Sequence, residues 1–64
     1  MGSYDVSKNE KGVWYAHRSG WPGIPVLGSF GSKKRAMFIA GNLMGLTYEQ
    51  YVEWRKKYGR KSHK

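Results

Sequence analysis

The stretch "LGSFGSKKRAMFIAGNLMG", residues 27 to 45, marks the point where an extended chain gives way to a helix. Ser32 is a good N-cap for a helix that begins at Lys33. The apolar residues that follow recur at helical spacing and include small side chains, which lets the helix lie close to a sheet. They are Ala36, Ile39, Ala40 and Leu43. Gly45 is placed to end this helix in the left-handed conformation.

Upstream, three segments are typical of β-strands. "SYDVSK", residues 3 to 8, alternates between polar and apolar side chains, and "VWYAHR", residues 13 to 18, is rich in branched and aromatic residues. "NEKG" between them is a turn sequence, and "SGWPGIP", residues 19 to 25, is an irregular connection. "VLGSF", residues 26 to 30, completes the set as a short third strand. The order predicts an α+β fold in which a three-stranded antiparallel sheet precedes the helices.

Downstream, a second helix opens at "TYEQ", residues 47 to 50, which has the pattern of a capping box. This helix runs through about Tyr58 and is stopped by Gly59. The whole chain is therefore expected to form one βββαα domain over residues 1–59, followed by a flexible basic tail at residues 60–64.

The composition indicates a partner with many negative charges. The 64 residues include 12 Lys and Arg against four Asp and Glu, a formal net charge of +8. Such an excess is usual in proteins that bind nucleic acid and less common in those that bind a membrane surface. No apolar run approaches the roughly 18 residues that span a bilayer, so we expect no membrane partner. The expected setting is cytoplasmic, either nucleoid-associated or in the cytoplasm of a host cell.

Signatures of an enzyme are missing from the sequence. There is no phosphate-binding glycine loop, no nucleophile elbow and no cysteine, and the four acidic residues are scattered. His17 and His63, the two histidines, fall in a predicted strand and in the tail, which argues against a metal site. We therefore expect a protein that is not an enzyme, with no catalytic residue, no metal and no cofactor.

The predicted helix begins with three cations, Lys33, Lys34 and Arg35, where the helix dipole is positive. Each is unfavourable there by roughly 0.3–1 kcal/mol at low salt. One interpretation is a solvated first turn. The favoured one is a phosphate, which the cations and the free N–H groups would attract together.

Other candidate residues for nucleic acid surround this helix start. Cations flank the first turn and the end of the second strand, aromatic side chains face outward from the predicted sheet, and further cations lie on the second helix and in the tail. These are Lys8, Lys11, Arg18, Tyr15, His17, Arg55, Lys56, Arg60 and Lys61. For Tyr15 and His17, an exposed face that is aromatic by chance is an equally good interpretation. Trp14 and Ala16 are assigned to the core, and Trp54 to packing.

The segment "GVWYAHR", followed after a loop by "LGSFGSKKRA", resembles the plant ethylene-response-factor (APETALA-type) DNA-binding domain and the arm-binding domains of phage and transposon integrases. The resemblance covers roughly residues 12 to 40. It rests on Gly12, Trp14, Leu27, Gly28, Ser29, Phe30, Ala36 and Ala40. It implies a three-stranded sheet that enters the DNA major groove, with Tyr15, His17 and Val26 on the side of the DNA. The family's arginine-rich first strand is replaced by "YDVSK", which implies a weaker sequence preference.

Three hypotheses follow from the sequence. The first is a small DNA-binding protein whose sheet face meets duplex DNA, of the kind that serves phages or mobile elements as an accessory or regulatory factor. The second is a protein-binding module, such as a viral inhibitor of a host factor, with Trp21, Tyr15 and Trp54 as anchors. The third is an RNA-binding protein, since exposed aromatics and cations also suit stacked single-stranded bases.

Overall fold

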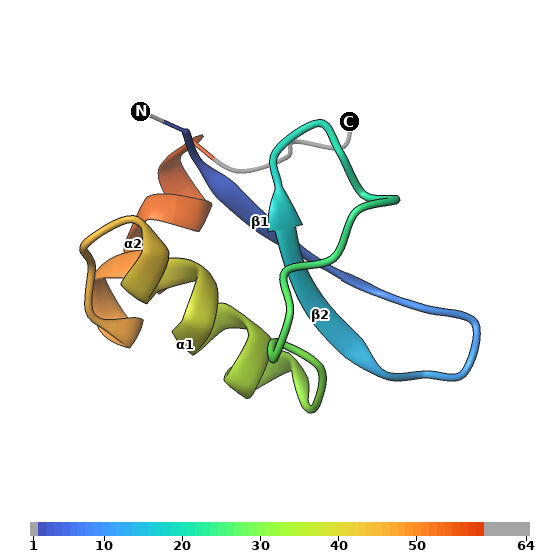
Figure 1. The fold of residues 1–64 in the computed structure, drawn as a ribbon. Helices are drawn as coiled ribbons and strands as arrows, with labels where there is room; N and C mark the ends of the chain where they lie inside the picture. Colours follow the sequence, from blue (N-terminus) through green and yellow to red (C-terminus); the bar gives the residue numbers. More distant parts are fainter. Residues whose placement is uncertain (1, 59–64) are drawn as a thin grey trace.

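The chain folds into a hairpin followed by two helices. The computed structural model describes residues 2–58. The elements are β1 (Tyr4–Lys8), β2 (Trp14–Arg18), α1 (Lys33–Leu43) and α2 (Tyr48–Tyr58). The strands pair antiparallel, α1 packs on both of them, and α2 packs on α1 (Figure 1). Within the described residues, neither helix has the length and apolar character needed to cross a membrane.

The hairpin turn forms where the sequence predicts it. The side-chain oxygen of Asn9 accepts hydrogen bonds from the backbone N–H groups of Lys11 (2.9 Å) and Val13 (3.0 Å). Gly12 has a φ of +82°, in the left-handed region that glycine adopts without strain. The two predicted strands and their turn are confirmed, although each strand begins one residue later than expected, at Tyr4 and at Trp14.

The predicted third strand at residues 26–30 is wrong. The sheet has two strands, and the backbone of the segment before α1 pairs with β2 in two isolated antiparallel bridges. These bridges join Trp14 to Gly31 and His17 to Pro25. The architecture is therefore ββαα, and the three-stranded sheet expected from the sequence and from the family resemblance is not formed.

A side chain replaces the missing strand between the two bridges. The Ser29 hydroxyl accepts a hydrogen bond from the Ala16 N–H at 2.9 Å and donates one to the Val26 carbonyl at 2.7 Å. The backbone turns at this point, since the Ser29 N–H also donates to the Val26 carbonyl at 3.2 Å and Gly28 has a φ of +82°. The polar groups on this side of β2 are thus satisfied without a third ladder.

Ser29→Ala is expected to lower the free energy of unfolding by about 1–3 kcal/mol, because the N–H of Ala16 would be buried without an acceptor. Both residues have no exposed surface. Chemical denaturation of the full chain measures the change. Ser19→Ala, at an exposed position, is the control and should stay within about 0.5 kcal/mol. Equal effects of the two substitutions would contradict the role given to the Ser29 hydroxyl.

The core lies between the hairpin and the two helices. Its buried apolar residues are Val6, Ala16, Ala36, Met37, Ala40 and Tyr51. Val6 and Ala16 are cross-strand partners, and the alanines of α1 let the helix approach them closely. Leu43, expected in the buried stripe, is instead 48% exposed, and Met37 takes part in the core.

Both helix starts are capped as the sequence predicts. The Ser32 hydroxyl accepts a hydrogen bond from the Arg35 N–H at 3.1 Å. In α2, the Thr47 N–H donates to the Gln50 side-chain oxygen at 2.9 Å, and the Gln50 N–H donates to the Thr47 hydroxyl at 3.1 Å. This reciprocal pair is a capping box, so the predicted start of α2 is confirmed.

Gly41→Ala is expected to destabilise the protein by about 1–2 kcal/mol, although alanine is ordinarily the better helix former. An added methyl would lie 2.9 Å from the Cβ of Tyr51 and 3.3 Å from the Leu46 carbonyl oxygen, so α2 would have to move. Thermal unfolding measures the effect. Gly23→Ala, with nothing within 4 Å of the added methyl, should be neutral or slightly stabilising. A stabilising Gly41→Ala would refute the close approach of the two helices.

Candidate nucleic-acid interface

Three lysines gather over two aromatic rings at the end of β1 and the start of α1. The Lys8 Nζ lies 5.9 Å from the centroid of the Trp14 ring, and the Lys33 Nζ lies 5.1 Å from it. The Lys34 Nζ lies 5.6 Å from the ring of Tyr48. Strand register accounts for the first contact, because Lys8 is the cross-strand partner of Trp14. We call these five residues the lysine surface.

The first turn of α1 adds unpaired backbone donors to this surface. Its N-cap, Ser32, satisfies the N–H groups of Arg35 and Ala36. Among residues 2–58 the N–H groups of Lys33 and Lys34 have no hydrogen-bond acceptor. The first turn also contains no acidic residue. Ammonium groups, free N–H groups and the positive end of the helix dipole therefore occur together, which favours a bound anion.

No carboxylate neutralises the lysine surface within the part of the chain that the structure describes. There, one ion pair is formed, between Arg55 and Asp5, at 3.5 Å. It joins α2 to β1 near the edge of the hairpin, and the side chain of Arg55 is 23% exposed. Arg55, a predicted nucleic-acid residue, therefore serves the fold.

Arg35 also has a structural role. Its Nε donates a hydrogen bond to the Phe30 carbonyl at 3.2 Å, and its Nη2 donates to the Gly28 carbonyl at 3.0 Å. The guanidinium group thus fixes the segment that precedes α1. Three cations were predicted to meet a phosphate at this helix start. Among the described residues, Lys33 and Lys34 form no ion pair, whereas Arg35 is hydrogen-bonded to two carbonyl groups.

The sheet face that was expected to meet DNA is closed. His17 is 4% exposed, its Nδ1–H donates to the Arg18 carbonyl at 2.8 Å, and its Nε2 accepts a hydrogen bond from the Ser7 hydroxyl at 2.7 Å. The Tyr15 hydroxyl donates to the Pro22 carbonyl at 2.7 Å. The connection from β2 to α1 therefore covers this face, and His17 is in no position to read a base.

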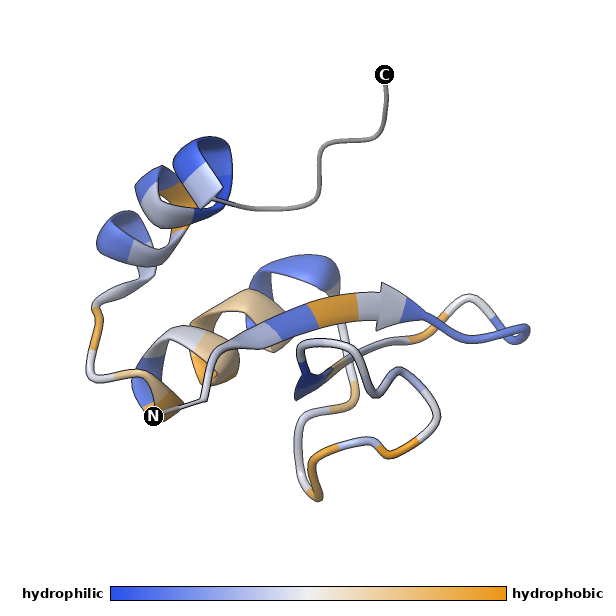
Figure 2. Cartoon of the chain, turned by 90° about the horizontal axis from the view of Figure 1, so that it is seen from above, coloured by the Kyte–Doolittle hydropathy of each residue, from blue (hydrophilic) through white to orange (hydrophobic). Residues whose placement is uncertain are grey.

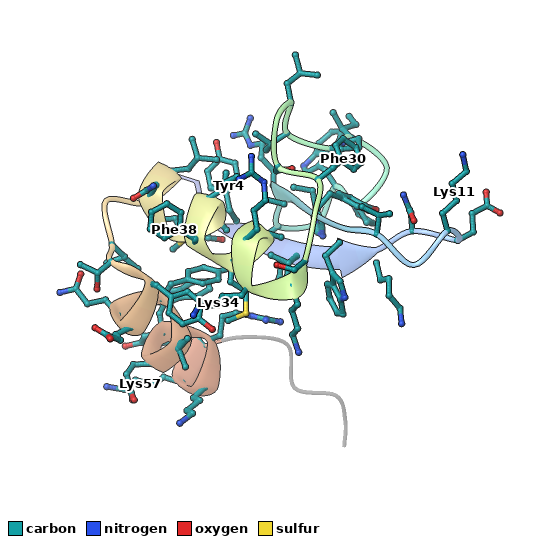
Figure 3. The ribbon with its side chains drawn as sticks, turned by 90° about the horizontal axis from the view of Figure 1, so that it is seen from below. Tyr4, Lys11, Phe30, Lys34, Phe38 and Lys57 are labelled. Carbon is teal, nitrogen blue, oxygen red and sulfur yellow. The ribbon has the colours of Figure 1, made fainter. Side chains whose placement is uncertain are left out.

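The remaining candidates lie apart from one another. Lys11 is exposed in the hairpin turn beside Glu10, Arg18 is exposed at the end of β2, and Lys56 is exposed on α2. Figure 3 shows how far the labelled lysines Lys11, Lys34 and Lys57 are spread over the molecule. Arg60 and Lys61 lie outside the described residues. From the predicted set, the structure thus brings Lys8 and Lys33 together over Trp14 and places Lys34, the next residue of α1, over Tyr48.

Two aromatic residues of the lysine surface were not predicted as part of a site. Trp14 was assigned to the core, and it does pack against the core while remaining partly exposed. Tyr48 was noted only as a capping-box position. Pairing Lys8 with Trp14 in the predicted hairpin register would have revealed the first contact. The contact between Lys34 and Tyr48 depends on how α2 folds back on α1, which the sequence pattern does not show.

The described residues contain no cluster of three or more His, Asp or Glu side chains that could hold a metal ion. In the comparisons with known proteins, no family model, no curated protein and no solved structure matches this chain.

Proposed function

We propose that the protein binds duplex DNA, with the lysine surface set against the phosphates. The observation that carries this proposal is that Lys8 and Lys33 both lie over the indole ring of Trp14. Among residues 2–58, neither lysine forms an ion pair with a carboxylate. The two ammonium groups lie 5.9 and 5.1 Å from the same ring centroid, so together they make this part of the surface positive. A polyanion is attracted to such a surface, and the release of its counterions adds to the affinity.

The aromatic rings hold the lysines in place for this contact. A cation over an aromatic face is stabilised by about 0.5–1 kcal/mol at an exposed site. Trp14 and Tyr48 thereby limit the freedom of the three lysine side chains, and less conformational entropy is lost when a phosphate binds.

The same contacts favour a duplex over a single strand. Single-stranded nucleic acid binds by stacking its bases on exposed aromatic rings. At the lysine surface the rings of Trp14 and Tyr48 are already faced by ammonium groups, so a base stacked there would have to displace a lysine. Contacts to phosphates position a protein on DNA without reading its sequence, so we expect weak sequence preference.

NMR titration of the full chain with a short random-sequence duplex, and with one of its single strands, tests the proposal. We expect the duplex to shift the indole N–H signal of Trp14 and the amide signals of Lys33 and Lys34. The plot of log affinity against log salt should have a slope of about −3 or steeper, since each neutralised phosphate contributes about −0.9. Shifts confined to residues 59–64, or tighter binding of the single strand, would contradict it.

A further inference from the structure

The connection between β2 and α1 carries an apolar surface that the proposed function does not use. Trp21, Ile24 and Leu27 are 59%, 61% and 92% exposed, and Phe30 is 44% exposed. Figure 2 shows the apolar residues that recur along this connection. We call these four residues the apolar loop surface. Exposed apolar patches commonly mark interaction sites, and Trp21 and Ile24 line one hollow here.

The apolar loop surface is held in place by hydrogen bonds of the backbone beneath it. The Trp21 N–H donates to the Arg18 carbonyl at 2.9 Å, and the Ile24 N–H donates to the Trp21 carbonyl at 3.2 Å. The hydroxyl of Tyr15 and the guanidinium group of Arg35 bind carbonyl groups on either side of Leu27 along the chain. The backbone is fixed while the apolar side chains point outward, and such preorganisation lowers the entropic cost of binding.

The charge beside this surface indicates what binds there. Arg18, Trp21 and Ile24 line a hollow of about 310 Å³. Arg18 has no carboxylate partner among residues 2–58, and residues 18 to 32 include no acidic residue and no lysine. Tryptophan and arginine are the residues most enriched at the energetic centres of protein interfaces, whereas lysine is depleted there. The hollow suits an apolar side chain with a carboxylate beside it.

We infer that the apolar loop surface docks a segment of another protein in which apolar residues stand next to Asp or Glu. This goes beyond the proposed DNA binding, because the two surfaces share no residue. The connection covers the face of β2 that carries Tyr15 and His17, whereas Lys8 and Lys33 surround Trp14, which points to the other face. The protein would then join a duplex to an acidic partner.

Two other occupants fit less well. A second copy of the chain would bring two unpaired Arg18 side chains and two net charges of +8 together, which is repulsive. A duplex wedged open by Leu27 needs several cations to hold the flanking phosphates, but residues 18 to 32 carry a single cation, Arg18, and Arg35 is engaged with carbonyl groups.

The probe for a test is a short peptide in which aspartate and leucine alternate, together with a control peptide that has asparagine in place of aspartate. In NMR titrations of the full chain, the acidic peptide should shift the Trp21 indole signal and the amides of Ile24 and Leu27. It should bind at least about tenfold more tightly than the neutral peptide. Arg18→Gln should abolish the difference in affinity between the two peptides. Trp21→Ser should weaken binding of the acidic peptide by about tenfold or more.

Duplex binding by the same variants separates this inference from the proposed function. Trp21→Ser and Leu27→Ser should leave duplex affinity within about twofold, whereas Lys33→Gln should reduce it and leave peptide binding unchanged. Peptide shifts at Trp14 and Lys33, or no shift at all, would overturn the docking inference alone. It would likewise be overturned if a duplex shifted the signals of Leu27, or if those signals changed with protein concentration as in self-association.

Discussion

Replacing Tyr51 with alanine is expected to lower the free energy of unfolding by about 3–5 kcal/mol, most of what a domain of this size possesses. The Tyr51 side chain has no exposed surface and is the largest fully buried one among the described residues. Its ring stacks on Trp54 at 5.7 Å between centroids, and its hydroxyl donates a hydrogen bond to the Tyr4 carbonyl at 2.6 Å. Tyr51 thereby links α2 directly to the first strand.

Two further variants make this prediction specific. Tyr51→Phe keeps the ring and leaves the Tyr4 carbonyl without its donor, so we expect a loss of about 1–2 kcal/mol. Tyr58→Ala, at a position 64% exposed at the end of α2, is the control and should change stability by about 0.5 kcal/mol at most. Denaturant unfolding followed by circular dichroism measures all three. A Tyr51→Ala protein as stable as the control would show that α2 does not depend on this residue.

The same side chain predicts a dependence on pH. The pKa of Tyr51 is raised from 10.0 to about 12, mainly by burial; of the neighbouring charges, Arg55 lowers the pKa and Asp5 raises it. Because the pKa is higher in the folded state, this contribution to stability is complete below pH 10 and is lost as the pH rises towards 12. The loss is about 1.4 kcal/mol per pH unit in that window. Tyr51→Phe should lack this component, so the difference in stability between the two proteins should shrink between pH 10 and 12.

Neutralising the lysine surface is expected to have the largest effect on binding. The combined substitution Lys8→Gln, Lys33→Gln and Lys34→Gln should lower duplex affinity on the order of a thousandfold at 50 mM salt, since each lost phosphate contact is worth roughly tenfold there. The slope of log affinity against log salt should become shallower by about 2.7. Fluorescence anisotropy with a labelled duplex, measured over a range of salt concentrations, gives both quantities.

A matched variant distinguishes binding at the lysine surface from attraction by the net charge of the protein. The combined substitution Arg18→Gln, Lys56→Gln and Lys57→Gln removes the same number of positive charges, three, from positions outside this surface. We expect the affinity to fall far less, through the long-range field alone, because Debye screening limits that field to about 10 Å at 0.1 M salt. If both triple variants lost the same affinity and slope, DNA would bind to the overall charge, and the proposed site would be wrong.

Local patterns predicted the elements that depend on neighbours along the chain. The hairpin turn needs Asn9 and Gly12 within one short segment, and both helix starts need a capping side chain three residues from its partner. These interactions join residues a few positions apart and need no distant contact. The predicted third strand does not form because the chain turns at Gly28 and the Ser29 hydroxyl, instead of a backbone carbonyl, accepts the hydrogen bond of the Ala16 N–H. This interaction joins residues thirteen positions apart, so the local pattern does not show it.

The sequence by itself determined the order of the hairpin and helices, the helix caps and the excess of positive charge, since each depends on composition or on residues a few positions apart. The tertiary structure decided which cations are free. It engaged Arg35 and Arg55 with carbonyl and carboxylate groups from other parts of the chain, buried His17, and left Lys8, Lys33 and Lys34 over aromatic rings. The physical reason is that a charge acquires its role from the groups that packing brings within a few ångströms, and sequence spacing does not specify those distances.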